Sequence, residues 1–72
     1  MAWHDNVQVD ALWTINEHAN AWAWIDGDWR KFDDNHEDSV INMAILCGNA
    51  KAGGRNVNAR IEDGRLKEIY VW

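Results

Sequence analysis

The sequence has no proline, a single cysteine and few basic residues. With Cys47 alone, no disulfide can form within the chain, and zinc sites built from paired cysteines and histidines are excluded as well. Cys47 follows Leu46 in an apolar run, so we expect a buried, reduced thiol. A chain of 72 residues that lacks these covalent or metal staples needs dense aromatic packing or oligomerisation to be stable.

Seven lysines and arginines stand against twelve aspartates and glutamates, a net charge of −5. Proteins that bind nucleic acids or anionic membranes need a basic face, so we expect neither partner. The longest apolar run, from about Val40 to Cys47, is too short to cross a bilayer. No basic segment followed by an apolar one opens the chain, so we expect a cytoplasmic protein, or a secreted one whose leader has been removed.

No low-complexity tract or linker interrupts the chain, so we expect residues 1–72 to form one domain. Apolar residues occupy every odd position from Val7 to Ile15, and only Leu12 breaks the alternation. This pattern predicts a half-buried strand, followed by a turn over residues 16–20.

Two aromatic-rich runs, Ala21–Ile25 and Asp28–Asp33, flank the pair Asp26-Gly27, which predicts a tight β-hairpin. Polar residues 33–39 end this hairpin, and the apolar residues after them recur at helical spacing, which predicts a helix of about three turns. Its expected buried stripe consists of Val40, Met43, Ala44, Cys47 and Ala50, widened by Ile41, Ile45 and Leu46.

The pair Gly53-Gly54 is typical of a helix C-terminus, and we expect one of the two to adopt a positive φ. An alternating strand, Val57–Ile61, comes next, then a second hairpin turn at Asp63-Gly64 and a last strand, Leu66–Trp72. The order β-β-β-α-β-β, mostly β with one helix (α+β), predicts a small five-stranded OB-like barrel.

Residues Met43–Ile61 comprise an apolar helix, the sequence Ala50-Lys51-Ala52-Gly53-Gly54, the basic Arg55 and an alternating strand. This stretch resembles part of small bacterial proteins similar to the B subunits of subtilase- and pertussis-like toxins. The resemblance implies an OB-type barrel, assembly into rings and glycan binding, and it assigns no individual sugar-binding residue. Those proteins usually pair cysteines, whereas this chain has one.

Tryptophan is the outlying residue type. The six copies are Trp3, Trp13, Trp22, Trp24, Trp29 and Trp72. We expect a core of this size to house about three indoles, because each is large and its N–H needs a partner when buried. Three roles stay open for the tryptophans: filling the core, joining subunits and binding a ligand.

The hairpin around Asp26-Gly27 is the candidate ligand site. Trp22 and Trp24 share one face of their strand, and Trp29 can lie beside them across the hairpin. Sugar rings present flat C–H faces that stack on indoles, while polar side chains bind the sugar hydroxyls. The polar residues expected to do so are Asn20, Asp26, Asp28 and Arg30.

No catalytic, cofactor or metal site is expected. His4, His18 and His36 are isolated in polar stretches, with no nucleophile recognisably beside them. The acidic run from Asp33 resembles a calcium loop, but it has Asp38 where such a loop requires glycine.

These observations predict a non-enzymatic binding module, a homo-oligomeric β-barrel that binds carbohydrate through its tryptophan-rich hairpin. Two other classes remain. One is a structural or assembly protein whose tryptophans form subunit interfaces. The other is an acidic inhibitor or immunity-type domain that binds a basic protein.

Overall fold

The strands and the helix follow one another in the predicted order β-β-β-α-β-β. The computed structural model describes residues 2–72. Its elements are β1 (Ala2–Thr14), β2 (Ala21–Ile25), β3 (Asp28–Phe32), α1 (Glu37–Gly53), β4 (Asn56–Glu62) and β5 (Arg65–Val71).

Two-residue turns join β2 to β3 and β4 to β5, as the sequence predicts. Asp26 and Gly27 have φ angles of 53° and 85°, and Asp63 and Gly64 have φ angles of 52° and 73°. The tight hairpin turn whose twist matches that of its strands needs a positive φ at both positions, and Asp-Gly pairs adopt it readily.

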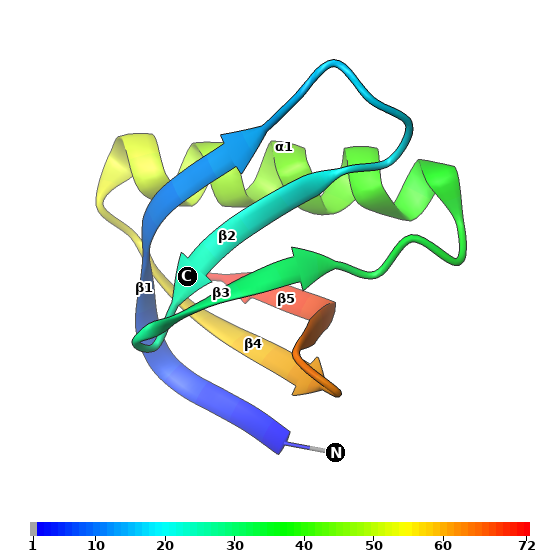
Figure 1. Cartoon of the computed structure of the whole chain (residues 1–72). Helices are drawn as coiled ribbons and strands as arrows, with labels where there is room; N and C mark the ends of the chain where they lie inside the picture. The colour runs from blue at the N-terminus through cyan, green and yellow to red at the C-terminus, as the bar shows by residue number, and fades with distance from the viewer. Residues whose placement is uncertain (1) are drawn as a thin grey trace.

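The five strands close into a barrel in the order β1-β2-β3-β5-β4, with β1 also paired to β4 (Figure 1). Neighbouring strands are antiparallel except β3 and β5, which run parallel at Lys31–Arg65 and Phe32–Leu66. This arrangement confirms the predicted OB-like barrel.

Strand β1 can pair with two neighbours because it is bent by two bulges. One extra residue lies between His4 and Val7 opposite β4, where Asn6 has a φ of 56°. A second lies opposite β2, where Val9 pairs with Ile25 but Ala11 already pairs with Trp24. A bulge adds a residue to one strand and bends it, and each bulge also reverses the face on which later side chains lie.

The prediction that the odd residues from Val7 to Ile15 share one face is therefore wrong. Asp10 is the extra residue, so Val9 points into the barrel while Trp13 pairs with the outward-facing Trp22. Leu12, the residue that broke the alternation, pairs with the buried Ala23 and lies on the inner face.

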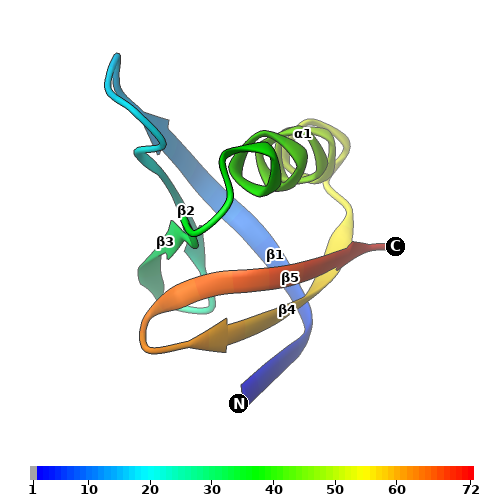
Figure 2. The same ribbon diagram turned by 90° about the vertical axis from the view of Figure 1, so that its right-hand side faces the viewer.

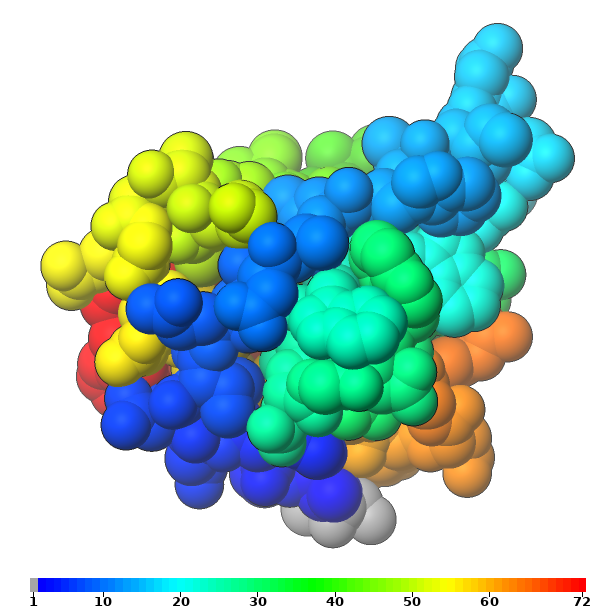
Figure 3. Space-filling model, turned by 60° about the vertical axis from the view of Figure 1, so that its left-hand side comes forward, coloured from blue at the N-terminus to red at the C-terminus, as the bar shows by residue number. Residues whose placement is uncertain are grey.

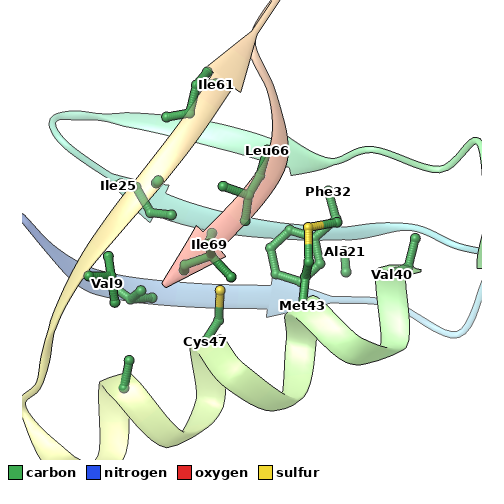
Figure 4. Close-up of a cluster of buried hydrophobic side chains, with 14 residues drawn as sticks. Val9, Ala21, Ile25, Phe32, Val40, Met43, Cys47, Ile61, Leu66 and Ile69 are labelled. Carbon is green, nitrogen blue, oxygen red and sulfur yellow. The ribbon is translucent and has the colours of Figure 1, made fainter. Parts of the chain in front are cut away.

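The core fills the barrel and the space between the barrel and α1 (Figure 4). The helix lies across one open end of the barrel, against β1 and β5 (Figure 2). Its side chains in the core are Val40, Met43, Cys47 and Ala50. The largest side chains that are fully buried are Phe32, Ile25, Leu66, Val57 and Cys47.

Helix α1 is longer than predicted, with 17 residues, and it buries a narrower stripe. Ala44, Ile41, Ile45 and Leu46 were expected in the stripe, but all four are exposed. The sequence could not separate them, because apolar residues surround the helix while only one side of it meets the barrel.

The helix ends as predicted at its glycines. Gly54 has a φ of 63°, and its N–H donates to the Lys51 carbonyl. The N–H of Arg55 donates to the Ala50 carbonyl over 2.9 Å. These two bonds form a Schellman motif, which needs a left-handed residue that glycine adopts without a Cβ clash.

None of the six tryptophans belongs to the core, so the expectation that about three of them fill it is wrong. Trp22 and Trp24 are half-buried, and the other four are exposed. The physical reason is the small bore of the barrel, in which Ala23 and Ala59 have no exposed surface at all. A five-stranded barrel filled mainly by alanine and aliphatic side chains, with Phe32 as the aromatic residue of the core, leaves no room for an indole.

Candidate ligand-binding site

Four tryptophans lie together on the outer side of β1, β2 and β3. Trp13 pairs across the strands with Trp22, and Trp24 pairs with Trp29. They point outward because the alternate residues of β2, namely Ala21, Ala23 and Ile25, are buried in the barrel. We call Trp13, Trp22, Trp24 and Trp29 the tryptophan face.

The tryptophan face contains an open hollow of about 340 Å³ lined by Trp13, Trp22 and Trp29. This volume is at the lower end of the range for small-molecule sites, about 300–1,000 Å³. Trp24 lies behind the hollow and meets Trp29 edge to face, with ring centroids 5.6 Å apart and planes at 89°. Trp24 therefore supports Trp29, and the other three indoles supply the accessible surface.

Asn20 fixes the orientation of Trp22. The indole nitrogen of Trp22 donates a hydrogen bond of 2.8 Å to the side-chain oxygen of Asn20. The amide nitrogen of Asn20 in turn donates to a Glu17 carboxylate oxygen over 2.8 Å, and Thr14 Oγ1 donates to the Asn20 carbonyl. Thr14 ends β1, and Glu17 and Asn20 belong to the segment between β1 and β2. This segment extends beyond the body of the molecule (Figure 3).

The other three polar residues predicted to bind sugar hydroxyls lie away from the hollow. Asp26 Oδ2 lies 2.6 Å from His4 Nδ1, at the end of the β2–β3 hairpin. Asp28 Oδ1 accepts a hydrogen bond from the Trp29 N–H. Arg30 pairs with the buried Ala23, and its guanidinium donates to the carbonyls of Ile25 and Asp26. Of the seven predicted residues, the structure brings Trp22, Trp29, Asn20 and the supporting Trp24 together.

Trp13 is the residue of the site that the sequence did not predict. It stands in an alternating run that placed it on the inner face, and the bulge at Asp10 moves it outward. The available signal was Leu12, because a single apolar residue out of phase is what an extra residue in the strand produces.

Three cations on β3 and β5 are paired with the two aspartates that follow β3. Lys31, which pairs with Trp22 on β2, lies 3.2 Å from Asp34, and Arg65 lies 3.3 Å from the same carboxyl group. Lys67 lies 3.2 Å from Asp33. The hydrogen bond from Lys31 lowers the pKa of Asp34, so this carboxylate is charged over the whole neutral range. The face is therefore apolar with a rim of paired charges.

A second group of aromatic rings lies on the outer side of β1, β4 and β5. Tyr70 stacks on Trp3 at a centroid distance of 5.7 Å and on Trp72 at 6.4 Å. Beside them Arg60 contacts Glu62 over 2.7 Å and Glu68 over 3.0 Å, and these carboxylates raise its pKa further. These three rings stack on one another, whereas three indoles of the tryptophan face line a hollow.

Among the described residues, no group of three or more His, Cys, Asp or Glu side chains is placed to hold a metal ion. Within residues 2–72, no helix combines the length and the apolar character needed to span a membrane. Comparisons with protein-family models, with characterised proteins and with solved structures find no match for this chain.

Proposed function

We propose that the protein is a non-enzymatic carbohydrate-binding module that holds a sugar ring in the hollow of the tryptophan face. The observation that carries the proposal is the exposure of tryptophan on one sheet face while the core contains none. Tryptophan is a large apolar side chain with a polar N–H, and a cluster of exposed indoles is typical of a surface that binds a partner.

The outer face of strands β2 and β3 is where OB-type barrels bind oligosaccharides and oligonucleotides. The charges of the protein favour the oligosaccharide over the negatively charged oligonucleotide. A nucleic-acid site neutralises phosphates with free lysines and arginines, but Lys31, Arg65 and Lys67 are paired with aspartates. The net charge of −5 adds to the repulsion of a polyanion.

The chemistry of the hollow favours binding over catalysis. Its lining consists of three indoles, which can stack on a ring but can neither attack a bond nor exchange a proton at neutral pH. Asn20 and Glu17, in the adjoining loop, hold the Trp22 ring in position through its indole nitrogen. The resemblance of residues 43–61 to toxin B subunits implies the same ligand class and remains an expectation.

A glycan array, followed by fluorescence titration of the best ligands, tests the proposal. Trp13→Ala and Trp22→Ala should each weaken binding by about 1–3 kcal/mol, by analogy with aromatic stacking on bases. Trp72→Ala is the matched control, because it removes an indole that is 63% exposed and lies outside the tryptophan face. It should leave binding unchanged.

Three results would count against the proposal. If no glycan binds, or if Trp72→Ala weakens binding as much as Trp22→Ala, the hollow is not a sugar site. If Trp13→Ala and Trp22→Ala instead reduce the mass of an oligomer, the tryptophan face is a subunit interface, as in the assembly alternative.

A further inference from the structure

The side of α1 that faces solvent is uncharged between the first and last turns, and apart from Asn42 and Asn49 it is apolar. From Ser39 to Ala50 the helix contains no charged residue. Ile41 and Ile45 are each 58% exposed. A helix on the surface of a domain normally carries charged side chains on its outer side, and one that is apolar all round is normally covered on all sides.

Apart from Leu46, the exposed apolar residues follow one line along the helix. We call Ile41, Ala44, Ile45, Gly48 and Ala52 the outer stripe. Their spacing of three and four residues is that of one helix face, opposite the core residues of the same helix. Its large side chains, Ile41 and Ile45, lie in its first half, and the small residues Gly48 and Ala52 lie in its second.

The apolar surface continues from the helix to the neighbouring hairpin formed by β1 and β2. Ala44 lines one hollow together with Thr14 and Ile41, and a second one together with Leu12. Leu12 faces inward but is 40% exposed, because the hairpin of β1 and β2 extends past the end of the barrel (Figure 2). Ile41 and Ala44 of the outer stripe thus line a groove between α1 and the hairpin of β1 and β2, which Glu17 and Glu37 also line.

The charges of α1 lie only at its ends and have opposite signs. Glu37 and Asp38 are in the first turn, and Lys51 is in the last. An identical helix laid antiparallel on the outer stripe would bring its lysine to the acidic end, and its acidic end to the lysine. A parallel arrangement would place like charges together, which is unfavourable.

We infer that the outer stripe binds the outer stripe of a second copy of this chain, in an antiparallel pair around a two-fold axis near Ala44 and Ile45. In this register Ile41 of each copy lies over Gly48 of its partner, so a large side chain fills the space above a glycine twice. Lys51 lies next to Glu37 and Asp38 of the other copy. A two-fold axis repeats every contact, as expected of a symmetric dimer.

A second copy suits this groove better than an unrelated protein does. The charged ends of α1 are complementary to those of a second, antiparallel copy, and the stripe itself is complementary in shape. It is also uncharged on a chain of net charge −5, so two copies can approach here with the least repulsion. A domain of 72 residues without a disulfide gains stability from such an interface.

Sedimentation analysis of the whole chain tests the pairing. We expect twice the chain mass of 8.3 kDa at micromolar concentration. Ile45→Glu should give the single-chain mass with an unchanged circular dichroism spectrum, because Ile45 is outside the core. Leu46→Glu adds the same charge to the same helix, at an exposed apolar residue that has no stripe residue three or four positions away, and should leave the dimer intact. A wild-type chain that stays at 8.3 kDa, or Ile45→Glu at the wild-type mass, overturns the inference.

Charge reversal tests the antiparallel orientation. Lys51→Glu should weaken the dimer about three- to tenfold, because two symmetric ion pairs become repulsions. Adding Glu37→Lys and Asp38→Lys to this variant should restore the wild-type dissociation constant. If Lys51→Glu leaves dimerisation unchanged, the helices do not pair in the antiparallel sense and the inference fails.

Discussion

The indole nitrogen of Trp22 and the side-chain oxygen of Asn20 are joined by a hydrogen bond of 2.8 Å that holds the Trp22 ring in place. Asn20 is itself held by Glu17, so the whole arrangement is anchored in the loop before any ligand arrives. Fixing a binding side chain in advance lowers the entropy that association would otherwise lose. The loop between β1 and β2 therefore contributes to the site although the hollow is lined by indoles.

We predict that Asn20→Ala weakens glycan binding about three- to tenfold, the effect of losing a hydrogen bond of roughly 1 kcal/mol. The fold should be retained, because the side chain of Asn20 lies outside the core. Asn16→Ala, an exposed asparagine in the same loop, is the control and should bind as the wild type does. Equal losses in the two variants, measured by fluorescence titration, would mean that the loop acts as a whole and that Asn20 has no special role.

A second prediction concerns stability and separates the core from the aromatic surface. Phe32→Ala should lower the free energy of unfolding by about 3–5 kcal/mol, since Phe32 is the largest fully buried side chain. Trp72→Ala should change it by no more than about 0.5 kcal/mol, because that indole is 63% exposed. Urea unfolding measures both. A large loss in Trp72→Ala would place this tryptophan in an interface that the single chain does not reveal.

The parts of the fold that were predictable from the sequence are those fixed by neighbouring residues. The turns at Asp26-Gly27 and Asp63-Gly64 need positive φ angles at both positions, and these residue types adopt them without help from the rest of the chain. Gly54 is equally local, because the carbonyls that it satisfies belong to the helix before it. The two turns and the end of the helix mark where neighbouring elements begin and end, so the order of strands and helix could be predicted.

The position of Trp13 was not predictable in this way. A bulge at Asp10 is required only because β1 must bend to pair with β2 at one end and with β4 at the other. That requirement arises from closure of the barrel, which involves residues far apart in the chain. The burial of α1 has the same origin: Ile45 and Met43 are equally apolar, and contact with the barrel decides which of them is covered.

The third prediction compares adjacent glycines at the end of α1. Gly54→Ala should destabilise the protein by about 1–2 kcal/mol, because a Cβ is unfavourable at a φ of 63°. Gly53→Ala should be neutral or stabilising by up to about 1 kcal/mol, because alanine is the better helix former. The added Cβ of Gly53→Ala would meet only the flexible Arg55 side chain, at 3.2 Å. Thermal melting of both variants checks the sign, and equal effects would contradict the assigned C-cap.

Cys47 has no exposed surface, and its burial raises the pKa of the thiol to about 12. Only the thiolate is a good nucleophile, so Cys47 should react with thiol reagents no faster than the protein unfolds. Rapid labelling of the native protein at neutral pH would contradict both its burial and the packing of α1 on the barrel. Labelling in denaturant provides the reference rate.

The same burial predicts how stability depends on alkaline pH. The unfolded chain loses the thiol proton above a pKa of about 8.5, whereas the folded chain keeps it up to about 12. Deprotonation thus favours the unfolded state, and the contribution of Cys47 to stability falls as the pH rises through this window. The fall approaches about 1.4 kcal/mol per pH unit well above pH 8.5. Cys47→Ala has no thiol proton to lose, so its unfolding free energy should decline less between pH 8 and 10. Parallel slopes in urea unfolding of the two proteins would show that the thiol is not held in its neutral form.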